Sequence, residues 1–225
     1  MSAAPDGTPA HLAGRFDVVD GEVEVGRATF AVLRPRNADD LISEADYVRD
    51  ERLPYWADVW PSSIALGRRL LEQHGAGRTL LELGCGVGVV ALSAARAGFA
   101  VTVSDYYEDA LAFAQANLAR AGFTAEARHL DWRALPDDLA TYDVVVASDV
   151  LYEKPYADLV AAVIDRTLAP DGVALVADPG RLAAPAFVEA AEARRLTVDG
   201  TDVRPVRIGE VVQRIRIYEL RRVRS

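Results

Sequence analysis

The chain has 225 residues, of which 51% are apolar, and its formal net charge is −9 at pH 7. This apolar fraction is sufficient for a folded core and excludes a wholly disordered chain. Nucleic-acid-binding proteins use basic surfaces to neutralise phosphates, so the excess of acidic residues argues against a nucleic-acid partner.

A single cysteine, Cys85, excludes an intramolecular disulfide framework, and three scattered histidines give no spacing typical of a metal site. No apolar run reaches the roughly 18 residues of a membrane span, and no charged-then-apolar leader opens the chain. We therefore expect a cytoplasmic protein without a metal, membrane or nucleic-acid partner.

The N-terminal quarter of the chain is predicted to form an extension to the main domain. Residues 1–14 are small, polar and rich in Pro and Gly, which indicates a flexible tail. Residues 15–35 alternate apolar and polar side chains around glycine-containing turns, which predicts two or three short antiparallel strands. Residues 37–53 are acidic and predicted to be helical, so that 15–50 form a β/α extension. Residues 54–63 combine three aromatic residues with two prolines, which predicts a loop.

The rest of the chain, the predicted core at 51–225, alternates strands and helices. A helix over Ile64–His74 is predicted to follow an N-cap at Ser62 or Ser63. Further strands are predicted at 79–83, 100–104, 125–130, 142–148 and 173–177, and further helices at 89–97, 108–121, 155–168 and 185–194. Apolar strands separated by helices predict one doubly wound α/β domain, 15–225, with a mostly parallel sheet and helices on both faces. The last alternating run, 209–220, predicts antiparallel edge strands.

The segment ELGCGVG, residues 82–88, links the first core strand to its helix and contains Gly84, Gly86 and Gly88. In a doubly wound sheet, ligands bind beyond the carboxyl ends of the strands, where glycines let the backbone approach them closely. The third glycine comes one residue too early for the dinucleotide fingerprint G-x-G-x-x-G, and no P-loop is present. A nicotinamide-dependent oxidoreductase is therefore the least favoured function.

Two acids accompany these glycines. Glu82 would repel a pyrophosphate, but it would attract the sulfonium and the α-amino group of another nucleoside cofactor. Asp105 stands 21 residues after Gly84, at the end of the next strand, and matches the acid that binds ribose hydroxyls. A plain tight turn at the glycines and a helix N-cap at Asp105 are the structural alternatives.

The pattern E-x-G-x-G-x-G followed by Asp105 resembles the class I S-adenosylmethionine-dependent methyltransferases. The resemblance implies a Rossmann-like sheet of seven strands with S-adenosylmethionine as the cofactor. It also implies that Asp131 accepts a hydrogen bond from the adenine amino group and that Trp132 stacks on the adenine ring. The alternatives are a solvated turn for Asp131 and a core anchor for Trp132.

Four further segments resemble the seven-strand protein lysine methyltransferases, a family that includes enzymes acting on the electron-transfer flavoprotein β subunit. They are PYWADVWPSS (54–63), LDW (130–132), ASDVLYE (147–153) and ADPGR (177–181), and the likeness covers about residues 50–181. It implies that Trp60 lies against the cofactor and that Ser148 contributes to its pocket. For Trp60 the alternative is a hydrophobic staple that holds the loop on the sheet.

The same resemblance makes Asp149 and Tyr152 the candidate catalytic residues, because they form the family's acid-x-x-aromatic motif. If they begin a helix, a spacing of three places both side chains on one side. The carboxylate would orient an ε-amino group, and an aromatic wall would favour its uncharged form. A helix cap and a packing residue are the alternatives for these two positions.

Together these features predict a monomeric protein-lysine N-methyltransferase. A small-molecule N- or O-methyltransferase on the same fold is the main alternative, since a fold does not fix the acceptor. A catalytically silent module that binds a partner protein is a further alternative.

Overall fold

The computed structural model describes residues 5–38, 41 and 54–223. The helix predicted over 37–53 falls almost entirely outside the described residues. Within the described part, no helix is long and apolar enough to cross a membrane.

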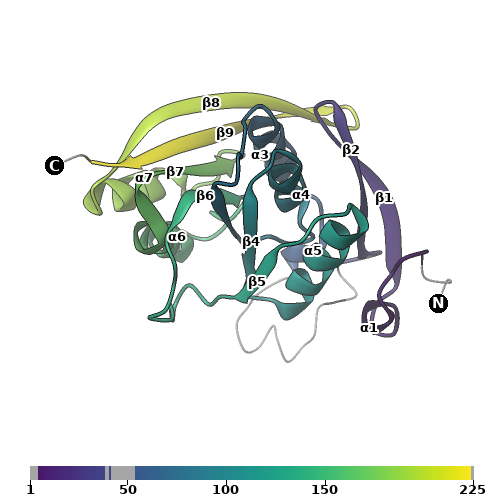
Figure 1. Cartoon of the computed structure of the whole chain (residues 1–225). Coiled ribbons are helices and arrows are strands. Elements are labelled where there is room, and N and C mark those ends of the chain that lie inside the picture. Colours follow the sequence, from purple (N-terminus) through teal and green to yellow (C-terminus); the bar gives the residue numbers. More distant parts are fainter. Residues whose placement is uncertain (1–4, 39–40, 42–53, 224–225) are drawn as a thin grey trace.

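A seven-stranded sheet in the order β5-β4-β3-β6-β7-β9-β8 forms the centre of the molecule (Figure 1). Its strands are β3 (Thr79–Leu83), β4 (Ala100–Asp105), β5 (Glu126–His129), β6 (Tyr142–Ser148), β7 (Leu168–Asp178), β8 (Leu196–Ile208) and β9 (Val211–Arg222). The pairs among β3 to β7 are parallel, whereas β9 pairs antiparallel with both β7 and β8. The predicted doubly wound, mostly parallel sheet is confirmed.

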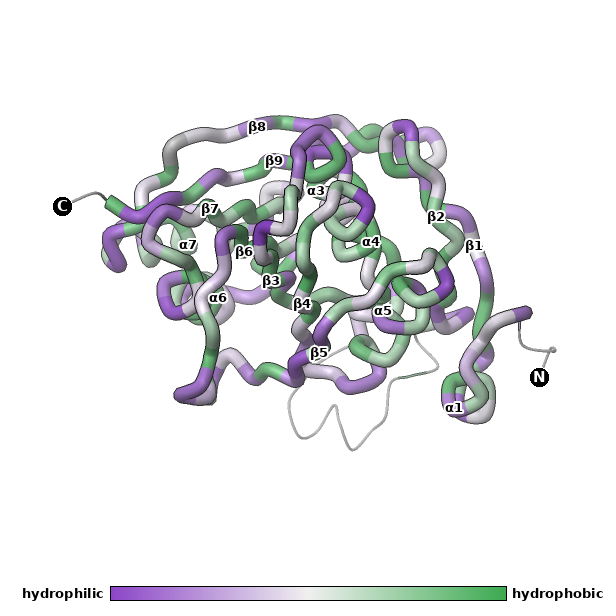
Figure 2. The backbone as a smooth tube through the Cα atoms, in the orientation of Figure 1, coloured by the Kyte–Doolittle hydropathy of each residue, from purple (hydrophilic) through white to green (hydrophobic). Residues whose placement is uncertain are grey.

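Helices cover both faces of this sheet. Each face is completed by a separate group of helices, namely α3 (Pro61–Leu71), α4 (Val89–Arg96) and α5 (Glu108–Arg120) on one side, and α6 (Lys154–Thr167) and α7 (Ala184–Ala193) on the other. Within β6, Val144 and Val146 belong to the first core cluster and Val145 to the second. A strand that is buried on both faces needs this continuous apolar sequence. Figure 2 shows the hydrophobic colour concentrated on the central strands.

The predicted N-terminal strands are confirmed as two, β1 (Val18–Val25) and β2 (Ala28–Pro35), paired antiparallel in a sheet of their own. Asn117 of α5, fully buried, ties this hairpin to the core. Its amide exchanges two hydrogen bonds with the backbone of Leu33, at 2.7 and 2.9 Å, and donates a third to the carbonyl of Val87, at 2.9 Å. The hairpin therefore buttresses the glycine-rich turn.

The prediction of a flexible tail over 1–14 is wrong for its second half. Residues Ala10–Ala13 form a short helix, α1, and Leu12 is fully buried in the larger core cluster. Although most residues of the segment are small or polar, the apolar side chain of Leu12 anchors it to the core.

The prediction of an N-cap at Ser62 or Ser63 is also wrong. Helix α3 begins at Pro61 and ends at Leu71, with Trp60 as its N-cap residue. Proline suits the first helical position because its φ is preset and its missing N–H would have no partner there. The preceding segment, predicted as a loop, contains one 3₁₀ turn, η2 (Tyr55–Ala57).

The C-terminal hairpin is longer than the predicted edge strands at 209–220. Strand β8, which precedes them, lies at the edge of the sheet and contains Gly200 and Pro205. These two residues usually interrupt strands, but an edge strand tolerates proline because one of its sides makes no ladder hydrogen bonds.

Candidate active site

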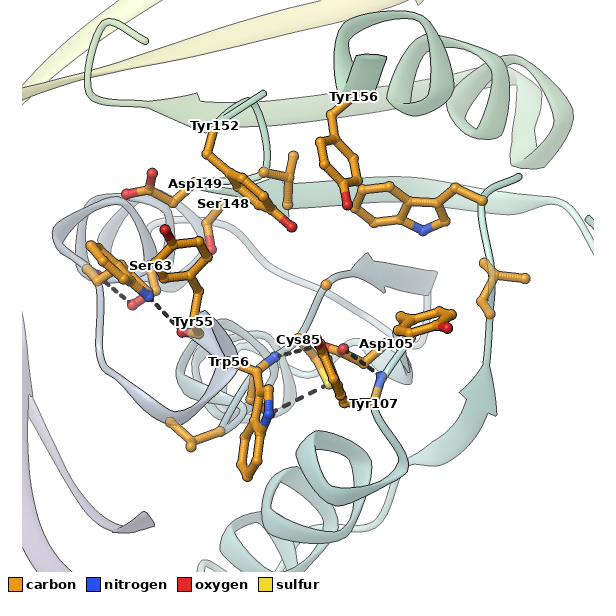
Figure 3. A pocket seen from close by; sticks show the side chains of 18 of the residues that line it. Tyr55, Trp56, Ser63, Cys85, Asp105, Tyr107, Ser148, Asp149, Tyr152 and Tyr156 are labelled. Atoms are coloured by element: carbon orange, nitrogen blue, oxygen red, sulfur yellow. Dashed lines mark hydrogen bonds between the residues drawn. The ribbon is translucent and has the colours of Figure 1, made fainter. Parts of the chain in front are cut away.

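A cavity opens at the carboxyl ends of β3, β4 and β6, where the strand order reverses (Figure 3). Ligands of doubly wound folds bind at this switch point. Most of the predicted site residues line the cavity, namely Trp60, Gly84, Gly86, Asp105, Asp131, Trp132, Ser148, Asp149 and Tyr152. Glu82 and Gly88 do not belong to its lining.

The three glycines between β3 and α4 all have positive φ, at +67° for Gly84, +50° for Gly86 and +87° for Gly88. A Cβ on Gly86 would lie 3.0 Å from the carbonyl oxygen of Trp56, and one on Gly88 would lie 3.0 Å from the Cα of Ala114 in α5. Gly86 therefore lets η2 approach the turn, whereas Gly88 serves the packing of two helices.

Glu82 lies behind the glycine turn and not beside the ligand space as predicted. Its carboxyl group is buried and accepts a hydrogen bond from the backbone N–H of Ala91, while Oε2 has no partner among the described residues. Burial raises the pKa of Glu82 well above its usual range, and the nearby Asp105 raises it further. The side chain therefore binds the first turn of α4, which follows the glycine turn.

Asp105 ends β4 and is fixed by backbone amides on both sides. Oδ2 accepts a hydrogen bond from Gly86 N–H and Oδ1 accepts one from Tyr107 N–H, both at 3.0 Å. Burial raises the pKa of Asp105, and these amide donors oppose that rise. The helix-cap alternative is wrong, because Tyr107 is the N-cap residue of α5 and no side chain caps that helix.

Asp131 and Trp132 follow β5 and line the same part of the cavity. The carboxylate of Asp131 pairs with the guanidinium of Arg133, with nitrogen–oxygen distances of 2.8 and 3.0 Å. The indole of Trp132 packs edge-on against Tyr156, with ring centroids 5.8 Å apart. Its buried Nε1 has no partner among the described residues.

Ser148 ends β6 and Asp149 follows it, at another side of the cavity, as Figure 3 shows. Asp149 has φ +58°, and its N–H donates to the carbonyl of Ala177 at 2.9 Å, which extends the pairing with β7. The predicted helical turn from Asp149 to Tyr152 is therefore wrong, since α6 begins only at Lys154. Both side chains nevertheless line one cavity.

The carboxylate of Asp149 is buried and already has partners. Arg181 donates from Nε at 3.0 Å and from Nη2 at 2.6 Å to Oδ1, and Ser62 donates from Oγ to Oδ2 at 3.0 Å. Ser62 thus binds Asp149 and does not cap its own helix. Arg181 comes from the DPGR segment, whose arginine had no predicted role.

Tyr152 belongs to a continuous row of aromatic rings. Its ring centroid is 4.7 Å from that of Tyr156 and 5.4 Å from that of Tyr55, which in turn lies 5.9 Å from Trp60. The indole N–H of Trp60 donates to the carbonyl of Tyr55 at 2.8 Å. The loop before α3 and the loop after β6 therefore build one aromatic wall.

A second, more open groove adjoins the cavity and shares three residues with it, Asp58, Trp60 and Asp149. Its other side is formed by the turn after β7, including Arg181, and by Ile208 and Gln213 of the C-terminal hairpin. Asp149 therefore lines both the cavity and the outer groove.

Comparison with known proteins identifies the fold and the family. The profile of the lysine methyltransferase family matches residues 52–192, which include every predicted site residue. The chain belongs to this family. The membership confirms the predicted resemblance and supports S-adenosylmethionine as the cofactor.

Individual members of the family are moderately similar. The chain is 29% identical over 131 residues to the electron transfer flavoprotein β subunit lysine methyltransferase of Danio rerio, covering 57% of this chain and 51% of that protein. It is 30% identical over 112 residues to protein N-lysine methyltransferase METTL21A of Xenopus tropicalis, covering 46% and 51%. The chain spans about half the length of these relatives.

A solved structure agrees with the family's fold. Magnesium protoporphyrin IX methyltransferase from Synechocystis, solved with bound S-adenosylmethionine, superposes with a TM-score of 0.62 at 18% identity. The match covers 83% of this chain and 95% of that one. The lysine methyltransferase fold of this chain is therefore the Rossmann-like methyltransferase fold.

Proposed function

We propose that the protein transfers a methyl group from S-adenosylmethionine to a lysine side chain of a protein. The observation that carries the proposal is the division of one cavity between two kinds of side chain. Asp105 lies at one side, whereas Ser148, Asp149 and Tyr152 lie at another (Figure 3). One side fits a nucleoside cofactor and the other fits an amine acceptor.

The cofactor side has the features that S-adenosylmethionine needs. The carboxylate of Asp105 is aligned by two backbone amides and faces the cavity, as a ribose acceptor must. Gly84 and Gly86 place no Cβ in the adjoining turn, so the backbone can approach a ligand closely there. The ring of Trp132, which lines the cavity, offers a flat face for a base. The carboxylate of Asp131 is paired with Arg133, and we therefore place Asp131 at the edge of the site for the adenine base.

The reaction asks the protein mainly to position its partners. When bound, S-adenosylmethionine supplies a methyl group activated by a sulfonium; the lysine nitrogen accepts it with its lone pair as the carbon–sulfur electrons leave with sulfur. The methylated ammonium then releases its proton to solvent. Asp149 orients the nitrogen through Oδ2, and the wall around Tyr152 excludes water, so proximity supplies most of the catalysis.

A small-molecule acceptor remains the second candidate, on one specific observation. The chain is 32% identical over 98 residues to the ubiquinone biosynthesis O-methyltransferase of Pseudomonas fluorescens, covering 43% of this chain and 42% of that protein. That match supports the shared cofactor fold and leaves the acceptor to be tested.

The test is incubation of the purified protein with radiolabelled S-adenosylmethionine and a proteome lysate, or with the electron transfer flavoprotein β subunit. We expect label in a protein band, at a lysine identified by peptide mass spectrometry. Label confined to small molecules would favour the second candidate. Cofactor binding without any incorporation would favour the silent binding module. Asp105→Ala is the control, because it should lose cofactor and label together.

We also propose that the protein is a monomer that acts in the cytoplasm and has no nucleic-acid or membrane partner. The acidic net charge of −9 supports the part on nucleic acids. Light scattering during gel filtration tests the monomer, since a mass of twice the chain would contradict it.

A further inference from the structure

We propose that Arg181 holds Asp149 as half of a neutral ion pair, so that the acceptor side of the cavity selects the uncharged amine. This inference rests on the proposed lysine acceptor and assigns Arg181 as a positioning residue. A lone carboxylate in the acid-x-x-aromatic motif would stabilise the ammonium form of lysine, which has no lone pair to accept the methyl group. Pairing the carboxylate with Arg181 removes this effect.

The geometry of the pair is specific. Both donating nitrogens of Arg181 converge on Oδ1 of Asp149, at 2.6 and 3.0 Å, and only 4% of the carboxylate side chain is exposed. Charge-assisted hydrogen bonds of this length are among the stronger ones in proteins. Among the described residues, Oδ2 accepts a hydrogen bond only from the Ser62 hydroxyl, which leaves it room to accept one more. One oxygen is therefore neutralised and the other can orient an amine.

Arg181 itself is held in place by the turn that carries it. Oδ1 of Asp178 accepts hydrogen bonds from the backbone amides of Gly180 and Arg181, both at 2.7 Å. The guanidinium carbon also lies 5.9 Å from the ring centroid of Trp60, a residue shared by the cavity and the outer groove. Although 36% of the side chain is exposed, its position is fixed by contacts on three sides.

The remaining charged groups around this site largely cancel. Asp58, which lines the cavity, faces Arg34 of β2 with 3.8 Å between nitrogen and oxygen. Asp178 is fully buried, and its burial raises its pKa. Arg216 of β9 lies opposite Asp178 in the strand register. The Asp149–Arg181 pair is therefore the main electrostatic influence on an acceptor nitrogen in this part of the cavity.

The other elements around this side contribute phenol groups. These groups are the phenols of the aromatic wall, Tyr55, Tyr152 and Tyr156. At the start of α6, Glu153 and Lys154 are exposed and do not belong to the cavity lining. Asp105 stands at the cofactor side, where backbone amides bind it.

The test is the pH dependence of kcat for Arg181→Gln, which keeps hydrogen-bond donors and removes the charge. The acidic limb of kcat reports ionisations in the enzyme–substrate complex. With Asp149 uncompensated, we expect this limb to move to higher pH by about one unit or more, the usual effect of an unscreened neighbouring charge. Arg181→Lys keeps the positive charge, so the acidic limb of kcat should stay near its wild-type pH. Asp149→Asn combined with Arg181→Gln should also return it there, at a lower rate.

Arg216→Gln is the matched control, because it removes the same charge beside Asp178 and should leave the limb unmoved. A folded Arg181→Gln variant with an unshifted limb and only a lower thermal midpoint would overturn the inference. If that variant does not fold, Arg181→Met, which retains bulk beside Trp60, answers the same question. Failure of the wild type to methylate any protein lysine would instead refute the proposed function.

Discussion

The two sides of the cavity are built in different ways. At the cofactor side, Asp105 is held by backbone amides of the turns that follow β3 and β4. At the acceptor side, Asp149 is held by the side chains of Ser62 and Arg181, which stand 87 and 32 positions away in the sequence. The first arrangement depends on local backbone geometry, and the second depends on the tertiary fold. Substitutions should therefore separate cofactor binding from methyl transfer.

The largest effect is expected for Gly86→Val, at the cofactor side. Valine at φ +50° would be strained, and its Cβ would lie 3.0 Å from the carbonyl oxygen of Trp56. We expect calorimetry to detect no binding of S-adenosylhomocysteine. Gly77→Val is the matched control, since Gly77 has φ +77° but nothing within 4 Å of its Cβ position. Normal cofactor binding by Gly86→Val would contradict the described turn.

Asp149→Asn should show the opposite behaviour, at the acceptor side. The carboxylate is absent from the network around Asp105, so affinity for S-adenosylhomocysteine should stay close to that of the wild type. Methyl transfer should fall by about a hundredfold, a loss of roughly 2.7 kcal/mol of transition-state stabilisation. Side-by-side measurement of turnover, cofactor affinity and thermal midpoint checks this. Unchanged turnover would remove Asp149 from the acceptor site.

Asn117→Ala should affect the cofactor side from a distance. The substitution leaves the backbone N–H of Leu33 and the carbonyl of Val87 without their buried partner. We expect a loss of about 1–3 kcal/mol of stability in urea unfolding, with a severalfold weaker affinity for S-adenosylhomocysteine. The control is Gln115→Ala, an exposed position on the same helix, which should change neither quantity. Equal behaviour of the two variants would show that Asn117 does not support the glycine turn.

The smallest effect is expected for Glu82→Gln, and it depends on pH. Burial raises the folded-state pKa of Glu82 well above its usual range. An acid whose pKa is higher in the folded than in the unfolded state loses stability as pH rises through this interval. The variant should therefore have the higher thermal midpoint at neutral pH, and its advantage should shrink as the pH falls toward the unfolded value, about 4.3. A constant difference in thermal midpoint between Glu82→Gln and the wild type across this pH range would contradict a raised pKa of Glu82.

The difference between the two sides also explains how much the sequence predicted. The strands, the parallel sheet and the cavity lining at Gly84, Gly86 and Asp105 follow from local patterns, because glycine and acid positions at strand ends have a regular geometry. The position of Glu82 does not follow in the same way, because its side chain is buried and does not line the cavity. A sequence pattern locates a residue near a site but does not decide which way it points.

The acceptor side was predicted less completely. Asp149 and Tyr152 were identified by resemblance, but the helical turn expected between them does not exist. The partners of Asp149, Ser62 and Arg181, are brought together only when the first turn of α3 meets the turn after β7. No spacing along the chain encodes such a contact. By contrast, at the cofactor side the buried Asn117, a polar residue on the apolar face of α5, is a signal that the sequence offers for the contact with the glycine turn.

The central claim, that one cavity holds its two reaction partners at two differently built sides, is tested most directly by a crystal structure with S-adenosylhomocysteine. We predict that the ribose hydroxyls lie within hydrogen-bond distance of Asp105 and that the sulfur faces the Asp149–Tyr152 side, with Arg181 still bound to Asp149. A ligand bound outside this cavity, or with its sulfur turned away from Asp149, would contradict the account.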